Sequence, residues 1–408
     1  MKKLFARVER YLKPVWRIGV IAAGWVVLNL FRRDLLKRDI WLVSEKRTEA
    51  RDNGYHFYKY LRKNHPQINA YYVITRDSAD LAKVTCLGNV IYADTFKHVL
   101  YYLAAVRSVS SQPYGSFPFG FILKELRVVN KFCNPRQKTA FLQHGIIVNS
   151  FPHESYDYDK CNLDFFTTAA QRECDFLRER HGYPEKAMKC VGLCRFDNLH
   201  NADGMKEKMI LVMPTWRMWL ARQKKGVPLT QKEIKFFRES EYFKQYSALL
   251  SNPQLLQTLR SSGYKLYFYV HYQFQDYVEL FRELDNDAVV IADRFHYDVQ
   301  DLMMRCAIMV TDFSSVHFDV AYMNKPLVYF QFDKEQHAQG HYEEGYFSYE
   351  EDAFGPCCYD AETVCNALEE MVAAGGVLTE KYRQRVREFF TVYDDKNCER
   401  TFEAIRDL

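Results

Sequence analysis

The stretch from Ile308 to Phe332 reads IMVTDFSSVHFDVAYMNKPLVYFQF and determines how the rest of the chain is interpreted. An apolar run ends at Thr311, a helix is predicted from residue 314 to about residue 323, and a second apolar run starts at Leu327. Two apolar strands separated by a helix are typical of a parallel β-α-β unit. The stretch therefore predicts an α/β fold built on a parallel sheet.

The same alternation of short apolar runs and helical stretches continues on both sides of this unit, from residue 39 onward. Strands are predicted at 40–43, 70–74, 90–92, 140–142, 165–167, 209–213, 265–270, 289–291, 307–311 and 327–330. A polar stretch at 198–208 interrupts the series, and we place a boundary after residue 203. The pattern predicts two similar α/β domains, 39–203 and 204–408, with a ligand in the cleft between them at the carboxyl ends of strands.

Residues 1–38 differ from the rest and are predicted to form a basic amphipathic helix. Residues 1–39 hold ten Lys or Arg against three acids, a net charge of +7, which leaves −3 for the remainder. The uncharged run Ile18–Phe31 would rise about 21 Å as a helix, whereas a span needs about 20 apolar residues. Basic flanks with Trp16 and Trp25 favour the surface of an anionic membrane. A helix packed on the protein body, or a single span, stays open as an alternative.

Charge and cysteine content argue against a nucleic-acid-binding protein, a disulfide-bonded protein and a metalloprotein. Because the positive charge is confined to one end, we expect no nucleic-acid partner. The eleven cysteines show no CxxC pair and no accompanying His cluster, so they are expected to be reduced thiols in the cytoplasm. No paired carboxylates suggest a metal site, and no cofactor is expected.

Ser314 and Ser315 follow the strand that ends at Thr311. Hydroxyls and backbone N–H groups at the start of a helix can bind an anion such as a diphosphate. The alternative is that either serine only caps the helix. Asp319, about one turn later, would meet a ligand hydroxyl or face solvent, and His317 is expected to pack or lie on the surface.

Other candidates also follow predicted strands. His144 lies in Gln143-His144-Gly145, and its imidazole would act as a general base on a hydroxyl or be a buried, hydrogen-bonded His. Arg217 in Pro214-Thr215-Trp216-Arg217 would bind phosphate through two hydrogen bonds. His271 would hydrogen-bond a diphosphate oxygen, or else be a satisfied core His.

These segments together resemble the CDP-glycerol glycerophosphotransferases, which build teichoic acids and related capsular polymers. The similar blocks are TDFSSVHFDVAYMNKPLVYF (311–330), QHG (143–145), VGLCRFD (191–197), PTWR (214–217), EEDAFGP (350–356) and YDDKNCERTFEAI (393–405). The likeness covers about residues 135–405, and WLVSEKRTEARDNGYHFYKYL (41–61) resembles a capsule-associated branch. Many members have Lys-x-His-Pro where this chain has Tyr269-Val270-His271-Tyr272.

The resemblance implies a GT-B fold, with two Rossmann-like domains facing a central cleft, and CDP-glycerol as donor. His144 would be the base on the acceptor hydroxyl, and Asp319 would approach the glycerol. The diphosphate and the rest of the donor would be held by Thr311, Ser314, Ser315, Thr215, Arg217 and His271.

The acceptor would be a lipid-linked polymer at the cytoplasmic face of the membrane. CDP-ribitol or another CDP-alditol stays open as donor. A GT-B glycosyltransferase using a nucleotide sugar and a non-catalytic membrane-bound scaffold are the rival functions.

Overall fold

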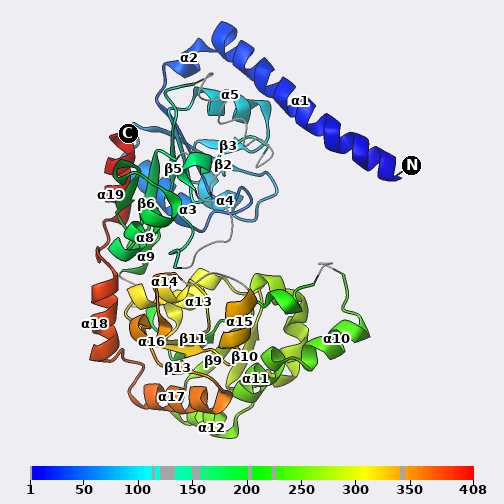
Figure 1. The fold of residues 1–408 in the computed structure, drawn as a ribbon, viewed down its shortest axis with the longest axis vertical. Helices are drawn as coiled ribbons and strands as arrows, with labels where there is room; N and C mark the ends of the chain where they lie inside the picture. The colour runs from blue at the N-terminus through cyan, green and yellow to red at the C-terminus, as the bar shows by residue number, and fades with distance from the viewer. Residues whose placement is uncertain are drawn as a thin grey trace. The chain divides into compact units, whose positions relative to one another are not determined.

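A computed structural model describes residues 2–112, 115–119, 134–148, 157–161, 163–200, 205–222, 227–340 and 345–408, with side chains from residue 15 onward except at 339 and 340. The chain divides into two compact units, both visible in Figure 1. The first contains residues 1–144, 154–197 and 394–408, and the second contains 145–153 and 198–393.

The first unit is built on a seven-stranded parallel sheet in the order β3-β2-β1-β4-β5-β6-β7. Its strands are β1 (Ile40–Ser44), β2 (Asn69–Ile74), β3 (Val90–Tyr92), β4 (Arg107–Ser110), β5 (Lys138–Phe141), β6 (Phe165–Thr168) and β7 (Met188–Cys190). All five residues of β1 are buried, as expected for a central strand covered on both faces. The strand order reverses between β1 and β4, and ligands of such sheets bind at the carboxyl ends of the strands beside this point.

The helices of the first unit lie around this sheet. They are α1 (Lys2–Phe31), α2 (Arg33–Leu36), α3 (Asn53–Asn64), α4 (Leu81–Thr85), α5 (Phe96–Ala104), α7 (Tyr158–Cys161), α8 (Gln171–His181), η2 (Glu185–Ala187) and α19 (Asn397–Arg406), with α9 (Phe196–Leu199) at the boundary between the units. The carboxyl-terminal helix α19, red in Figure 1, packs beside α3. The Phe402 ring stacks on the His65 ring with centroids 3.8 Å apart.

This packing changes the expected division of the chain. The second domain was expected to run from residue 204 to the end, but the main segment of the second unit is 198–393, and residues 394–408 belong to the first unit. The reason is the apolar face of α19, whose Phe402 and Ile405 are buried in the core of the first unit. Helical periodicity alone does not reveal which of two sheets such a face covers.

The second unit repeats the topology with a six-stranded parallel sheet in the order β10-β9-β8-β11-β12-β13. Its strands are β8 (Met209–Val212), β9 (Lys265–Tyr269), β10 (Val289–Ala292), β11 (Ile308–Thr311), β12 (Leu327–Phe330) and β13 (Cys357–Cys358). All four residues of β8, β11 and β12 are buried, so these strands form the centre of the core. The order reverses between β8 and β11, which pair directly.

Local signals in the sequence set the helix ends of this unit. Its helices are η4 (Met218–Leu220), α10 (Gln231–Arg238), α11 (Glu241–Leu250), α12 (Pro253–Ser262), η5 (Tyr272–Leu284), α13 (Val299–Arg305), α14 (His317–Tyr322), α15 (Lys334–Gly340), α16 (Tyr349–Asp352), α17 (Ala361–Ala373) and α18 (Glu380–Phe389). Thr230 and Glu233 form a capping box at the start of α10. Asn252 caps α12, which ends at Gly263 with φ of 74°.

The amino-terminal helix α1 is longer than the uncharged run that predicted it and packs against α5. Gly24 permits the close approach, because a Cβ there would lie 2.6 Å from Val99 Cγ1. The buried side of α1 carries Ile21 and Leu28, whereas other positions expose Trp16 and Trp25. No helix within the described part of the chain is long and apolar enough to cross a membrane.

Candidate functional site

The loops that follow β8, β11 and β9 bring together most of the residues predicted to bind a donor. Residues 214–217 follow β8, residues 312–315 follow β11, and His271 follows β9. Thr311 is buried, and its hydroxyl donates to the carbonyl of Met213 at 2.8 Å, which ties the ends of β8 and β11 together. The loops therefore lie at the point where this sheet reverses, the usual place for a ligand.

Arg217 is fully buried and anchors these loops. Its Nε and Nη2 donate to the two carboxylate oxygens of Asp333 at 2.6 and 2.9 Å. Its Nη1 donates to Asp312 Oδ2 at 2.8 Å and to the Thr215 carbonyl at 2.9 Å. Burial disfavours the charged guanidinium, but the two carboxylates outweigh it and raise the pKa of Arg217. Four of the five N–H groups of this side chain thus have partners inside the protein.

Asp312 is the acceptor that shapes the loop after β8. Its two carboxylate oxygens accept the backbone N–H of Thr215 at 2.9 and 3.0 Å, and Oδ1 also accepts the N–H of Phe313 at 2.7 Å. Burial opposes ionisation, but Arg217 and the hydrogen bonds lower the pKa of Asp312. The hydroxyl of Thr215 is buried and makes no well-formed hydrogen bond among the described residues, although it lies close enough to Asp312 to help lower the pKa of that carboxyl. A bound ligand or a water molecule would satisfy such a group.

Ser314 and Ser315 lie in the turn before α14, which begins at His317 and not at the serines. Ser314 is half-buried and Ser315 is exposed, and no hydrogen bond of either hydroxyl occurs within the described residues. No side chain caps α14, whose N-cap position is Val316, so neither serine is a helix cap. Two hydroxyls at a strand end that have no structural partner are suited to bind a ligand.

The two other polar residues of this segment are buried. Asp319 is 3% exposed on α14, so it does not face open solvent. His317 packs in the core, where Nδ1 lies 2.7 Å from the Tyr329 hydroxyl. Burial lowers the pKa of His317 to about 3, so its imidazole is neutral. Of the two expectations for His317, packing or a place on the surface, the structure shows packing.

His271 is the N-cap of η5. Its Nδ1 accepts the backbone N–H of Gln273 at 3.2 Å, and its ring stacks on Trp216 with centroids 6.3 Å apart. An imidazole whose Nδ1 accepts a hydrogen bond carries its proton on Nε2 when neutral. His271 and Trp216 therefore present adjacent rings from the loops after β9 and β8.

His144 belongs to the first unit and follows β5. The residue is exposed, yet the surrounding protein desolvates its imidazole and lowers the pKa of His144 below 6.5. The Asp52 carboxylate opposes this shift, and the Arg195 guanidinium adds to it. A hydrogen bond to the backbone of Ser111 also favours the charged ring. A neutral imidazole that reaches solvent at a strand end can accept a proton near pH 7.

The loop that carries His144 is held by two residues that sequence reasoning missed. Asn53 Nδ2 donates to the carbonyls of Leu142 and Gln143 at 3.2 and 2.8 Å. Arg195 donates from its backbone N–H to Asn53 Oδ1 at 3.0 Å, and from Nη1 to the His144 carbonyl at 3.2 Å. Gln143 has φ of 56°, so these bonds hold a left-handed backbone conformation immediately before His144.

A third missed feature is a pair of carboxylates close to this loop. Asp52 Oδ1 accepts from Arg195 Nη1 at 3.0 Å. Glu45, directly after β1, is buried, and desolvation together with Asp52 raises the pKa of Glu45 to about 8. The signal that could have revealed these residues is their place: Glu45 follows β1, the strand at which the first sheet reverses.

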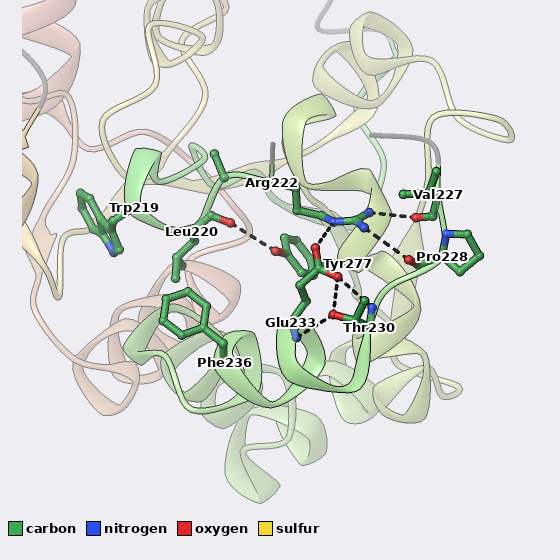
Figure 2. A pocket seen from close by; sticks show the side chains of 10 residues that line it. Trp219, Leu220, Arg222, Val227, Pro228, Thr230, Glu233, Phe236 and Tyr277 are labelled. Carbon is green, nitrogen blue, oxygen red and sulfur yellow. Dashed lines mark hydrogen bonds and ion pairs between the residues drawn. The ribbon is translucent and has the colours of Figure 1, made fainter. Parts of the chain in front are cut away.

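Two further features concern clustered metal ligands and a pocket away from the strand-end loops. No group of three or more His, Cys, Asp or Glu side chains suited to a metal occurs in the described ranges. Figure 2 shows a pocket of about 500 Å³ between η4 and α10, in which Arg222 pairs with Glu233. None of the predicted site residues lines this pocket.

Comparison with known proteins identifies related sequences. The family model described as CDP-Glycerol:Poly(glycerophosphate) glycerophosphotransferase matches residues 26–407. The minor teichoic acid biosynthesis protein GgaB of Bacillus subtilis (strain 168) is 30% identical over 395 residues, which are 94% of this chain and 41% of that protein. The teichoic acid glycerol-phosphate primase of the same organism is 23% identical over 218 residues, 51% of this chain and 49% of that protein. The chain thus spans less than half the length of these two relatives.

Solved structures share the fold. The wall teichoic acid polymerase TagF superimposes with a TM-score of 0.69 at 16% identity, over 100% of this chain and 98% of that chain. A putative UDP-N-acetylglucosamine 2-epimerase from Listeria monocytogenes gives a TM-score of 0.55 at 11% identity, over 91% of this chain and 96% of that chain. The expected fold class, GT-B-like with two parallel-sheet α/β domains, is confirmed.

Proposed function

Because the chain belongs to the CDP-glycerol:poly(glycerophosphate) glycerophosphotransferase family, we propose that it transfers a polyol phosphate from a CDP-activated donor to a hydroxyl of a teichoic-acid-type polymer. Glycerol phosphate is the group expected to move, and CMP is the expected product. Glycerol-phosphate and teichoic acid chemistry also appears in the names of the relatives, such as the primase of Bacillus subtilis.

The observation that best supports a phosphate-containing donor is that the hydroxyls of Ser314 and Ser315 have no hydrogen-bond partner within the described residues. Both serines follow β11, beside the point where the second sheet reverses. The buried hydroxyl of Thr215, which makes no well-formed hydrogen bond among the described residues, comes from the adjoining loop. Hydroxyl hydrogen bonds to an ionised phosphate are stronger than those to a neutral acceptor. These three groups would hold the diphosphate, and His271 would donate from Nε2 to it.

Arg217 and Thr311 are then positioning residues and not direct ligands of the donor. Four of the five N–H groups of Arg217 already have partners, so a contact to phosphate through two hydrogen bonds would break one of them. Giving up a carboxylate would leave a charge buried and unpaired, at a cost of several kcal/mol. The hydroxyl of Thr311 is already donated to Met213. Both would act by holding the loops that carry Thr215 and Ser314. Asp319 remains a proposed contact of the glycerol moiety.

In the chemical step, the neutral imidazole of His144 takes the proton of the acceptor hydroxyl. The hydroxyl oxygen forms a bond to the β-phosphorus of the donor. The bond between that phosphorus and the bridging oxygen breaks, and CMP leaves with the electron pair. General-base catalysis of this kind contributes about 10²–10⁴-fold to a rate. Residues of this chain would thus bind the donor, remove the proton and offset charge on CMP.

The test is CMP release from CDP-glycerol with source-cell membranes as acceptor, comparing the wild type with His144→Ala. Release by the wild type and loss in the variant would support both the donor and the base. An inactive wild type with CDP-glycerol would contradict the donor, and CDP-ribitol and UDP-sugars would then be tried. Release of UDP from a UDP-sugar would identify a glycosyltransferase, and full function of His144→Ala would support a scaffold.

We also propose that α1 attaches the protein to the cytoplasmic face of the cell membrane as a peripheral protein. Trp16 and Trp25 are 60% and 41% exposed although the same helix buries Ile21 and Leu28 on the protein. The segment to residue 39 carries a net charge of +7. Exposed indoles with basic neighbours suit an anionic lipid surface. This position would bring the enzyme to a lipid-linked acceptor.

A further inference from the structure

Asp52 occupies the N-cap position of α3, but its carboxylate does not cap the helix. An aspartate at this position normally accepts the N–H groups of the first turn. Glu45 takes that role here: Oε2 accepts the N–H of Asp52 at 3.0 Å and that of Tyr55 at 3.1 Å, and Oε1 accepts that of Arg51 at 2.6 Å. The Asp52 carboxylate is therefore available for another partner.

The start of α3 is held rigidly against the end of β1. A Cβ on Gly54 would lie 2.3 Å from the carbonyl oxygen of Ser44, so only glycine allows this approach. Asn53, the first residue of the helix, is fully buried and bonds to the carbonyls of Leu142 and Gln143. Asp52 thus has a fixed place relative to the loop that carries His144.

Arg195 connects Asp52 to the His144 loop. The residue is 9% exposed, and the same Nη1 group donates to Asp52 Oδ1 at 3.0 Å and to the His144 carbonyl at 3.2 Å. The arginine backbone N–H is bound by Asn53 at 3.0 Å. Segments from three parts of the chain, 52–53, 142–144 and 195, are joined by these bonds.

We propose that Asp52 is a positioning residue for His144, held in place by Arg195, that stabilises the imidazolium formed during proton transfer. This inference rests on the proposed role of His144 as the base. When the hydroxyl O–H bond breaks and the imidazole N–H bond forms, Asp52 stays ionised and no proton moves to it. The charged groups that face His144 within the first unit are Asp52 and Arg195, with Glu45 behind Asp52.

Burial raises the pKa of Asp52, and the charges of Arg195 and His144 oppose that shift. Asp52 favours the charged imidazole, whereas burial and Arg195 favour the neutral one. His144 therefore rests in the neutral form, and the carboxylate lowers the energy of the ring once it carries the proton. A purely structural Asp52 would hold the loop but would not need a charge.

The charge is tested with Asp52→Asn in the full-length chain, since Asn keeps an oxygen for Arg195. Asp52→Glu is the conservative rescue. Asp164→Asn is the matched control, because Asp164 pairs with Lys138 at 3.2 Å at the start of β5, whereas His144 follows its end.

His144 is titrated by NMR with ¹³C-labelled histidine, and the spectrum of His144→Gln identifies its signal. CMP release from CDP-glycerol gives kcat and KM.

We expect Asp52→Asn to lower the pKa of His144 and to reduce kcat about 10- to 100-fold, as for other residues that orient a functional side chain. The KM for CDP-glycerol should stay unchanged, Asp52→Glu should recover part of kcat, and Asp164→Asn should behave as wild type. An unchanged titration of His144, or an unchanged kcat, in Asp52→Asn would overturn the proposal. The titration needs no turnover, so inactivity of the wild type with CDP-glycerol would contradict the proposed donor without affecting this result.

Discussion

Arg217 Nη1 and Asp312 Oδ2 lie 2.8 Å apart, and neither side chain has any exposed surface. The two residues come from the loops after β8 and β11, and Asp333 binds the opposite side of the guanidinium. The ion pair therefore fixes two neighbouring strand-end loops relative to each other. The guanidinium of Arg217, paired with both carboxylates, therefore holds the loops that carry the proposed donor-binding residues.

Replacing Arg217 by Met should destabilise the protein strongly. The change leaves Asp312 and Asp333 buried without their counter-charge, which costs about 3–5 kcal/mol in comparable buried pairs. Urea unfolding followed by circular dichroism measures this loss. The control is Arg260→Met, which removes an exposed pair with Asp287 and should leave the unfolding midpoint unchanged. Equal effects of the two substitutions would contradict the anchoring role.

Ser314→Ala and Ser315→Ala should weaken the use of donor without lowering stability. Neither hydroxyl has a partner within the described residues, so the fold loses no hydrogen bond. A lost hydrogen bond to a charged phosphate corresponds to about a 10-fold or larger drop in kcat/KM. CMP release and the thermal midpoint are measured on the same samples. Ser251→Ala, at the C-cap of α11, is the control for kcat/KM, and an unchanged kcat/KM for both serine variants would remove them from the site.

The pH dependence of kcat/KM should reflect the environment of His144. Because desolvation lowers the pKa of this imidazole, the ring is neutral at pH 7 and becomes protonated only below pH 6.5. The rate constant should therefore be level around pH 7 and fall on the acid side of 6.5. Initial rates of CMP release from pH 5 to 8 test this. An acid limb centred above pH 7 would contradict a neutral resting base.

The buried His317 should make the protein sensitive to acid. The pKa of this side chain is about 3 in the folded state against 6.5 when unfolded, so below pH 6.5 the unfolded chain binds a proton that the folded chain does not. Stability is retained above pH 6.5 and is lost as the pH falls, by about 1.4 kcal/mol per pH unit for one proton. Urea unfolding from pH 4.5 to 7.5 measures the slope.

His317→Gln is the matched variant for that slope. The loss of packing should lower the free energy of unfolding by the same amount at every pH. The slope of that free energy against pH should be shallower than in the wild type by about one proton. Parallel curves for the two proteins would show that His317 does not contribute.

Removing the exposed indoles of α1 should reduce membrane binding and leave the fold intact. Trp16→Ser and Trp25→Ser together take away aromatic side chains that are largely exposed, although the edge contact of Trp16 with the Phe119 ring is also lost. Co-sedimentation with phosphatidylglycerol vesicles measures the effect, and near-ultraviolet circular dichroism checks the fold. Tyr359→Ser, which changes an exposed aromatic side chain of the second unit, should bind as wild type. Undiminished sedimentation of the double variant would contradict the proposed attachment.

The sequence predicted most of the central strands because apolar runs such as Ile40–Ser44 and Ile308–Thr311 are buried on both faces. It missed β4, β7 and β13. The segments of these strands, Arg107–Ser110, Met188–Cys190 and Cys357–Cys358, are short or carry small polar residues. They become strands by pairing with β1, β6 and β12, so their state is decided by neighbours distant in sequence.

The sequence by itself determined two parallel α/β units and the positions of polar residues at strand ends, including His144 and Ser315, because both follow from local hydrophobic patterns. Only the tertiary structure decided what surrounds those residues. Arg217 meets Asp333 from 116 positions away, and Arg195 meets Asp52 from 143 positions away. Burial and charge pairing depend on such long-range contacts, and no local pattern reveals which side chain will supply the partner.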